Sequence, residues 1–262
     1  MRILVISLSK ISKAFLKTLK KSLESEAIIE IYSPNSSIEN YTCVNSYGQL
    51  NGIYTHIFLG CKPQHVQDVA QNLPKIYDER TIFISVLAGT TTEKICTLFN
   101  TSKVFRIMPS LAFEFGNSFL AYNAHNIEEN SMEEIKNLFG KNSLITCKND
   151  DEINYFTGIY GSGIGFVFEI MNAFFANSTS LFPEEDGRKI VLNLFENACV
   201  YMKHNPNLSF FEAVQNVASK GGTTEAGIEF FRKNGALNGI ISDAISSAIA
   251  KSQNLAENLG KL

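Results

Sequence analysis

The stretch Ser219–Gly227 contains residue types that could bind a small anion: Ser-Lys-Gly-Gly-Thr-Thr-Glu-Ala-Gly. Gly221 and Gly222 can adopt positive φ without steric cost and let a ligand approach the backbone closely. Thr223 or Thr224 would then cap a helix whose unpaired N–H groups carry partial positive charge. The same residues also suit an ordinary Gly-Gly turn with a threonine cap, so the stretch alone leaves both interpretations open.

Four further motifs contain residues that could contact a cofactor or substrate. Ser7-Leu-Ser-Lys-Ile-Ser12 has the spacing of the nucleotide-binding motif Gly-x-Gly-x-x-Gly, with serine at all three glycine positions. Two motifs come where later strands are expected to end: Gly60-Cys-Lys-Pro-Gln64 and Arg106-Ile-Met-Pro-Ser110. Another strand is expected to end at Ala88 and Gly89, and Gly161-Ser-Gly-Ile-Gly165 lies within a long predicted helix. Ligands of open α/β sheets bind beyond the carboxyl ends of the strands.

In the first half of the chain, strand and helix patterns alternate around these motifs. Short β-branched and hydrophobic runs predict strands at about 3–6, 27–32, 55–59, 81–87, 103–108, 118–122 and 143–147. Helical spacing of apolar residues predicts helices at about 11–23, 63–73, 91–99 and 128–139. Such alternation predicts a mostly parallel sheet covered on both faces, and therefore a doubly wound α/β domain at residues 1–150.

The second half, residues 151–262, is expected to be an all-helical domain. Helical periodicity predicts helices at about 151–178, 184–203, 209–218, 223–233 and 236–258. Their apolar faces are wide for a unit of this size, so part of that surface is expected to meet a second copy of the chain.

Composition excludes several classes of protein. The chain has 262 residues, 45% hydrophobic and 19% charged, with a net charge of −3, which argues against a nucleic-acid partner. Its five cysteines and four histidines are scattered, so a disulfide framework or a metal site is not expected and a reducing cytoplasm fits. The lysine-rich residues 1–24 read as strand, turn and helix rather than a targeting peptide.

No membrane span is expected from the sequence. The longest apolar run, residues 164–176, is interrupted by Glu169 and Asn172 and is shorter than the about 20 residues that a span needs.

Taken together and in this order, the motifs resemble those of the pyrroline-5-carboxylate reductase family, which reduces a cyclic imine carboxylate to proline with a nicotinamide cofactor. The family carries Ser-Pro-Gly-Gly-Thr-Thr-x-Ala-Gly where this chain has Ser219–Gly227, so that Lys220 is the one departure among the fixed positions. Further departures are Ser110 for asparagine, and Ile164 and Gly165 for Pro-Ala.

The resemblance implies a Rossmann domain followed by a helical domain that intertwines in a homodimer or a higher homo-oligomer, with an imine carboxylate as substrate and NADPH or NADH as cofactor. It assigns Gly221, Gly222, Thr223 and Thr224 to a substrate carboxylate clamp, in which the Thr224 hydroxyl contacts the substrate nitrogen or carboxylate. Ser162 is placed near the nicotinamide. Cofactor-binding positions by this likeness are Ser7, Ser9, Lys10, Ile11, Ser12, Lys62, Pro63, Ala88, Gly89, Met108 and Pro109.

Two of these positions have competing interpretations. Lys62 is either a ligand near the cofactor ribose or a solvated lysine before a helix-opening proline. Arg106 is expected to be structural rather than catalytic.

The serine-substituted loop conflicts with this assignment. Side chains at Ser9 and Ser12 add bulk where pyrophosphate and a helix–strand contact need space, although serine hydroxyls and Lys10 can also bond phosphate. Ser33–Ser36, after the second strand, offers neither an arginine for a 2′-phosphate nor an acid for a ribose hydroxyl, which leaves NAD and NADP open. The alternatives are a catalytically impaired homologue that serves as a binding or assembly protein, and a reductase of another small imine or keto acid.

Overall fold

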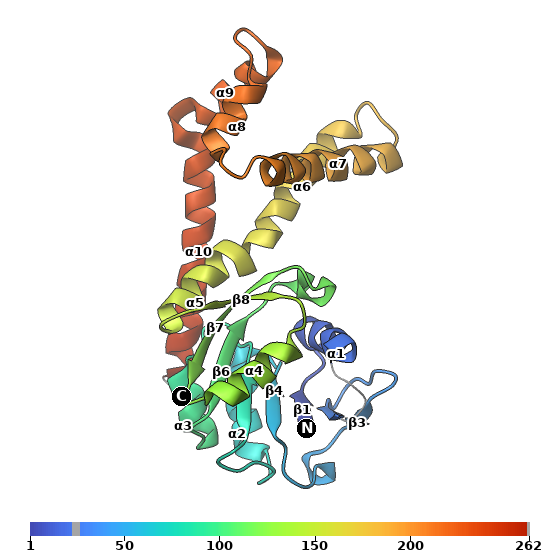
Figure 1. Ribbon diagram of the computed structural model, residues 1–262, viewed down its shortest axis with the longest axis vertical. Coiled ribbons are helices and arrows are strands. Elements are labelled where there is room, and N and C mark those ends of the chain that lie inside the picture. Colours follow the sequence, from blue (N-terminus) through green and yellow to red (C-terminus); the bar gives the residue numbers. More distant parts are fainter. Residues whose placement is uncertain (23–26, 261–262) are drawn as a thin grey trace. The chain divides into compact units, whose positions relative to one another are not determined.

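The computed structural model describes residues 1–22 and 27–260 and divides into two compact units (Figure 1). The first comprises Met1–Ser162 together with the residues from Ser247 onward, and the second comprises Gly163–Ser246. The first unit therefore extends beyond residue 150 and also takes up the end of the last helix. The division into functional domains at residue 150 stays a prediction, and each unit is described here by itself.

The first unit contains an eight-stranded sheet in the order β3-β2-β1-β4-β5-β6-β7-β8. Its strands are β1 (Arg2–Ile6), β2 (Ile28–Tyr32), β3 (Thr42–Val44), β4 (His56–Leu59), β5 (Ile82–Ser85), β6 (Val104–Met108), β7 (Phe119–His125) and β8 (Ser143–Thr146). All neighbours pair in parallel except β6 and β7. The expected doubly wound α/β class is confirmed.

Two features of the sheet differ from the sequence prediction. The short strand β3 was not predicted, because three residues carry too little periodicity to be recognised. Strand β7 runs antiparallel because only the short helix η3 (Leu111–Phe115) links it to β6, and a parallel return needs a longer crossover.

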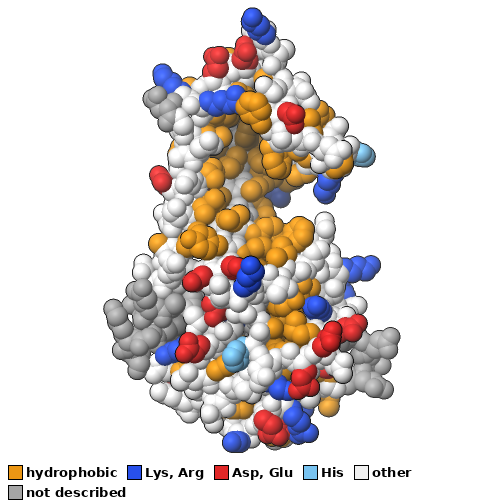
Figure 2. Space-filling view, turned by 60° about the vertical axis from the view of Figure 1, so that its left-hand side comes forward, with side chains coloured by type: hydrophobic (Ala, Val, Ile, Leu, Met, Phe, Trp, Pro, Cys, Tyr) orange, Lys and Arg blue, Asp and Glu red, His pale blue; other side chains and the backbone are white. Residues whose placement is uncertain are grey.

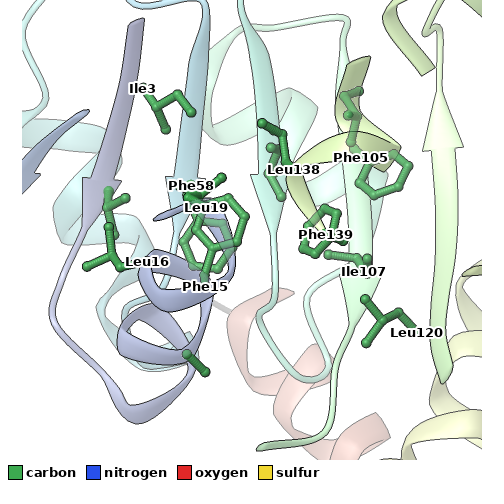
Figure 3. Packing of buried hydrophobic residues seen from close by; sticks show 14 of the residues in the cluster. Ile3, Phe15, Leu16, Leu19, Phe58, Phe105, Ile107, Leu120, Leu138 and Phe139 are labelled. Atoms are coloured by element: carbon green, nitrogen blue, oxygen red, sulfur yellow. The ribbon is translucent and has the colours of Figure 1, made fainter. Parts of the chain in front are cut away.

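Helices cover both faces of this sheet. Two of them, α1 (Lys10–Ser22) and α4 (Glu129–Leu138), contribute to a core cluster on one face. In that cluster the ring of Phe15 stacks on Phe58 with centroids 4.1 Å apart, and Phe139 lies beside it at 5.4 Å (Figure 3). The opposite face is covered by α2 (Val66–Asn72), which follows the short helix η2 (Pro63–His65), and by α3 (Thr92–Phe99).

A buried arginine fixes the remaining elements of the first unit to the sheet. Arg106, on β6, is 1% exposed and forms an ion pair with Asp150 at 2.7 Å and a hydrogen bond to Asn154 at 2.9 Å. Asp150 also accepts hydrogen bonds from the N–H and hydroxyl of Thr92, while Asn154 accepts one from Ser252. A charge buried this deeply is stable only when it is paired and hydrogen-bonded, so the network holds α5 (Asp150–Phe156) and the end of α10 (Ala236–Gly260) in place.

The second unit is helical, as the sequence predicted. It contains α6 (Gly163–Ser178), α7 (Glu184–His204), α8 (Phe210–Val217), α9 (Thr223–Arg232), η5 (Lys233–Gly235) and the first part of α10. Many large apolar side chains on these helices are exposed, among them Phe168, Phe174, Leu192, Phe211, Phe230 and Ile240. Figure 2 shows hydrophobic side chains gathered on the surface of the molecule. Exposed apolar area of this extent marks an interaction surface.

The helical run Asp150–Ser178 bears on the expectation that the chain has no membrane span, which stays a prediction. It has 29 residues, and an 18-residue window within it reaches a mean hydropathy of 1.3, which satisfies the length and composition of a span. The sequence argument missed this because it required an unbroken apolar run, whereas the window averages over Glu169 and Asn172. One such helix is weak evidence for a membrane location.

Candidate functional site

In the loop from β1 to α1, the first serine takes a backbone conformation that favours glycine. Ser7 has φ of +75°, a left-handed conformation that glycine adopts without cost and serine does not. Ser9 precedes α1, and its hydroxyl accepts a hydrogen bond from the Ser12 N–H at 3.1 Å and pairs with the Ser12 hydroxyl at 2.9 Å. The Ser9 side chain therefore caps the helix and occupies one amide that a phosphate could use.

A glycine just after the neighbouring strand β4 makes room for Ser12. The Ser12 side chain is fully buried, and a Cβ at Gly60, just after β4, would collide with the Ser12 hydroxyl. That Cβ would also lie 3.3 Å from the carbonyl oxygen of Ile6. The extra volume of the serine is thus accommodated at Gly60, a role that the sequence analysis did not recognise.

The loop still fits a pyrophosphate at the start of α1. Among the described residues, the amides of Lys10 and Ile11 donate to no protein atom, and the first turn of α1 contains no acidic residue. The Lys10 side chain is exposed beside them. Helix N-termini with free amides attract phosphate, so Ser7, Ser9, Lys10, Ile11 and Ser12 lie together where a dinucleotide could bind.

The neighbouring strand ends carry the next group of candidate cofactor residues. Lys62 has an exposed side chain and precedes Pro63 at the start of η2, which leaves both of its interpretations open. After β5, Gly89 adopts φ of +70° next to Ala88, and the buried hydroxyl of Thr90 has no partner among the described residues. A buried hydroxyl without a partner is uncommon in folded proteins and is consistent with a ligand-binding region.

A π-helical turn, Thr157–Gly161, interrupts the long helix predicted for residues 151–178, and Ser162 donates its N–H to the Thr157 carbonyl at 2.7 Å. Such turns are frequent at functional sites. Met108 lies against it, because a Cβ at Gly161 would be 3.7 Å from the Met108 Cγ. Ala88 packs on the same small cluster as Met108.

Three motifs far apart in the sequence therefore meet at this turn, near Ala88, Met108 and Ser162. Pro109, which follows Met108, is buried.

In the second unit, the two adjacent glycines before α9 are required for different reasons. Gly221 has φ of +73°, which disfavours any side chain. Gly222 donates its N–H to the Ser219 carbonyl at 2.9 Å, and a Cβ on it would lie only 2.6 Å from the Ser219 hydroxyl oxygen. The turn therefore needs both glycines.

The expected threonine cap is wrong. The N-cap of α9 is Gly222, so that Thr223 and Thr224 are the first two helical residues and neither caps the helix. Glycine has no side chain that could accept from the first turn. The amides of Thr223, Thr224 and Glu225 consequently donate to no protein atom within the described part of the chain, and they remain free for a ligand.

Glu225 is a residue that the sequence analysis missed. Its carboxylate accepts the N–H of Gly221 at 2.6 Å. A glutamate three positions after an N-cap is a known helix-start signal, and it would have been recognised if Gly222 had been taken as the cap.

Two other reactive side chains, Cys61 and His56, are held in their neutral forms by burial. Burial raises the pKa of the Cys61 thiol to about 11, so this cysteine stays protonated near neutral pH. Burial likewise lowers the pKa of His56 to about 4, which keeps its ring neutral. No cluster of His, Cys, Asp and Glu suited to a metal ion occurs among the residues that the structure describes.

The chain has clear relatives among known proteins. The family model described as pyrroline-5-carboxylate reductase dimerisation matches residues 150–255. The pyrroline-5-carboxylate reductase of Staphylococcus haemolyticus is 27% identical over 206 residues, which cover 78% of this chain and 75% of that protein. The Staphylococcus aureus enzyme is 26% identical over 200 residues, which cover 75% and 73%.

Solved structures show the same fold. Plasmodium falciparum pyrroline carboxylate reductase, determined with NADP bound, matches with a TM-score of 0.87 at 18% identity and 98% coverage of both chains. The 1-pyrroline-5-carboxylate reductase of Streptococcus pyogenes matches with a TM-score of 0.82 at 22% identity, covering 97% of this chain and 98% of that one.

Proposed function

We propose that the chain is a member of the pyrroline-5-carboxylate reductase family and that it reduces 1-pyrroline-5-carboxylate to L-proline. The observation that carries this proposal is the uncapped start of α9, where the motif Ser219–Gly227 leaves three amides free. Free amides at a helix N-terminus bind a carboxylate through hydrogen bonds and the helix dipole.

The residues of this clamp bind and orient the substrate. Gly221 and Gly222 shape the turn, and the N–H groups of Thr223 and Thr224 hold the substrate carboxylate. The Thr224 hydroxyl contacts the substrate nitrogen or carboxylate. An iminium carbon is already electrophilic, so orientation rather than a strong general acid is what the protein must provide.

NADPH, when bound, supplies the hydride that converts the substrate C=N bond to a C–N single bond. The amides of Lys10 and Ile11, the Lys10 side chain and the serine hydroxyls of the first loop would hold its pyrophosphate. Lys62, Pro63, Ala88, Gly89, Met108, Pro109 and Ser162 would line the rest of its site. NADPH or NADH could fill this role, because Ser33–Ser36 after β2 has neither an acid for a ribose 2′-hydroxyl nor an arginine for a 2′-phosphate.

One observation favours the catalytically impaired homologue as a second candidate. The Ser9 hydroxyl already occupies the Ser12 amide, which removes one phosphate ligand from the loop. In this alternative the chain keeps the fold and the clamp but binds dinucleotide too weakly for turnover.

The match to the dimerisation domain of the family supports a homo-oligomer. The exposed apolar side chains of the second unit supply the surface for it, and we propose a homodimer or a larger assembly. A cytoplasmic location agrees with five cysteines that are all free.

The test is to measure NADPH and NADH binding to the purified chain, followed by turnover of pyrroline-5-carboxylate. Binding of NADPH with turnover supports the reductase. Binding of neither nucleotide at millimolar concentration eliminates the reductase and leaves the impaired homologue.

A further inference from the structure

The carboxylate of Glu225 lies at the rim of the clamp. It accepts the Gly221 N–H at 2.6 Å, although Gly221 precedes the helix and Glu225 is its third residue. The side chain therefore reaches back toward the start of α9, where the free amides of the first turn lie. One negative charge of the protein is fixed beside the place proposed for the substrate carboxylate.

This charge is not neutralised within the protein. Among the described residues, no lysine or arginine forms an ion pair with Glu225. The nearest cation in the sequence, Lys220, has an exposed side chain.

The combination of free amides and a fixed carboxylate has a defined electrostatic preference. A ligand that carries only a carboxylate can accept hydrogen bonds from the free amides. Glu225 repels it, however, because like charges at close range destabilise each other. A ligand that carries a positive nitrogen next to its carboxylate gains both interactions. An imine carboxylate in its protonated form and its amino acid product have this charge pattern, whereas a keto acid does not.

We propose that the Glu225 carboxylate binds the positively charged nitrogen of the substrate and makes the clamp selective for imine carboxylates over keto acids. This inference rests on the proposed function, since it places the substrate at the start of α9. The carboxylate also favours the protonated form of the imine, which is the form whose carbon accepts a hydride.

The experiment compares two ligands that share a ring and a carboxylate but differ in charge. Binding of L-proline and of cyclopentanecarboxylate to the full chain is measured by ligand-observed NMR titration. The variant Glu225→Gln removes the charge but retains a side-chain oxygen for the Gly221 N–H, so the turn is preserved. Glu229→Gln, one helical turn further along α9 and exposed, is the matched control because it removes the same charge from the same helix.

The wild-type chain is expected to bind L-proline at least tenfold more tightly than cyclopentanecarboxylate. Glu225→Gln should lower this ratio about tenfold, and Glu229→Gln should leave it unchanged. Equal binding of both ligands by the wild type, or an equal loss of preference in both variants, overturns the role of Glu225 while the clamp itself stands. If the wild type binds neither ligand, the proposed function fails with it.

Discussion

The two helix N-termini proposed to bind anions, those of α1 and α9, are built in opposite ways. Before α1, where glycine is usual, this chain has serines, and Ser9 caps the helix with its own hydroxyl. Before α9, where a capping side chain would stabilise the helix, it has Gly222 and no side-chain cap. A helix start that is capped from within is more stable but offers a ligand fewer amides.

The two helix starts differ in how many backbone amides are left without a protein partner among the described residues. The start of α9 has three free amides, and it lacks the stabilisation of about 1 kcal/mol that a side-chain cap contributes. The start of α1 retains two, and its third is held by Ser9. The following predictions test this difference, beginning with the largest expected effect.

Gly222→Ala should disrupt the carboxylate-binding site proposed at the start of α9. Its Cβ would lie 2.6 Å from the Ser219 hydroxyl oxygen and 2.9 Å from the Ser219 carbonyl oxygen, so the turn must shift and the amides lose their alignment. We expect kcat/KM to fall about a hundredfold, or about 2.7 kcal/mol. Gly227→Ala, in the same helix with no atom near the added Cβ, is the control and should be active.

Gly60→Ala should destabilise the first unit, because the added Cβ collides with the buried Ser12 hydroxyl. Overpacking of this kind costs about 2 kcal/mol, measured as a change in the free energy of unfolding in denaturant. The double variant Ser12→Gly/Gly60→Ala should recover most of the loss. Equal destabilisation in both backgrounds would show that Gly60 does not compensate for Ser12.

Thr224→Ala removes the hydroxyl proposed to contact the substrate but leaves the backbone amide. Turnover should fall at least tenfold, or about 1.4 kcal/mol, with the fold unchanged by circular dichroism. Thr223→Ala serves as the comparison, since only its amide is assigned to the clamp. An unaffected rate in Thr224→Ala removes its hydroxyl from the mechanism.

Ser7→Gly should stabilise the chain by about 1 kcal/mol, because φ of +75° strains serine and not glycine. The thermal unfolding midpoint reports this change. A lower midpoint would mean that the Ser7 side chain contributes interactions that outweigh the strain.

Ser9→Gly tests whether the cap of α1 competes with a dinucleotide. Freeing the Ser12 amide should tighten NADPH binding about threefold, or about 0.7 kcal/mol, as measured by fluorescence titration. Weaker binding would instead show that the Ser9 hydroxyl is itself a phosphate ligand, and α1 and α9 would then be alternative solutions to the same task.

Sequence patterns alone predicted most of the elements and their order. Buried parallel strands read as continuous apolar runs, and amphipathic helices have a period that survives without any structure, so β1, β4, β5, β6 and α1 were found directly. The family motifs likewise identified Gly221 and Gly222 from residue type and spacing. These features depend on residue type and on the spacing of nearby residues, both of which can be read directly from the sequence.

Only the tertiary structure decided the details on which chemistry depends. The fit of Ser12 against Gly60 joins helix α1 to the residue after β4, and the ion pair of Arg106 with Asp150 joins a strand to a helix. The sequence pattern also did not predict the π-helical turn before Ser162 or the N-cap position of Gly222. Shifting a helix boundary by one residue leaves the periodicity of its apolar residues almost unchanged. That single residue nevertheless determines which amides are free, and it brings the Glu225 carboxylate to the start of α9.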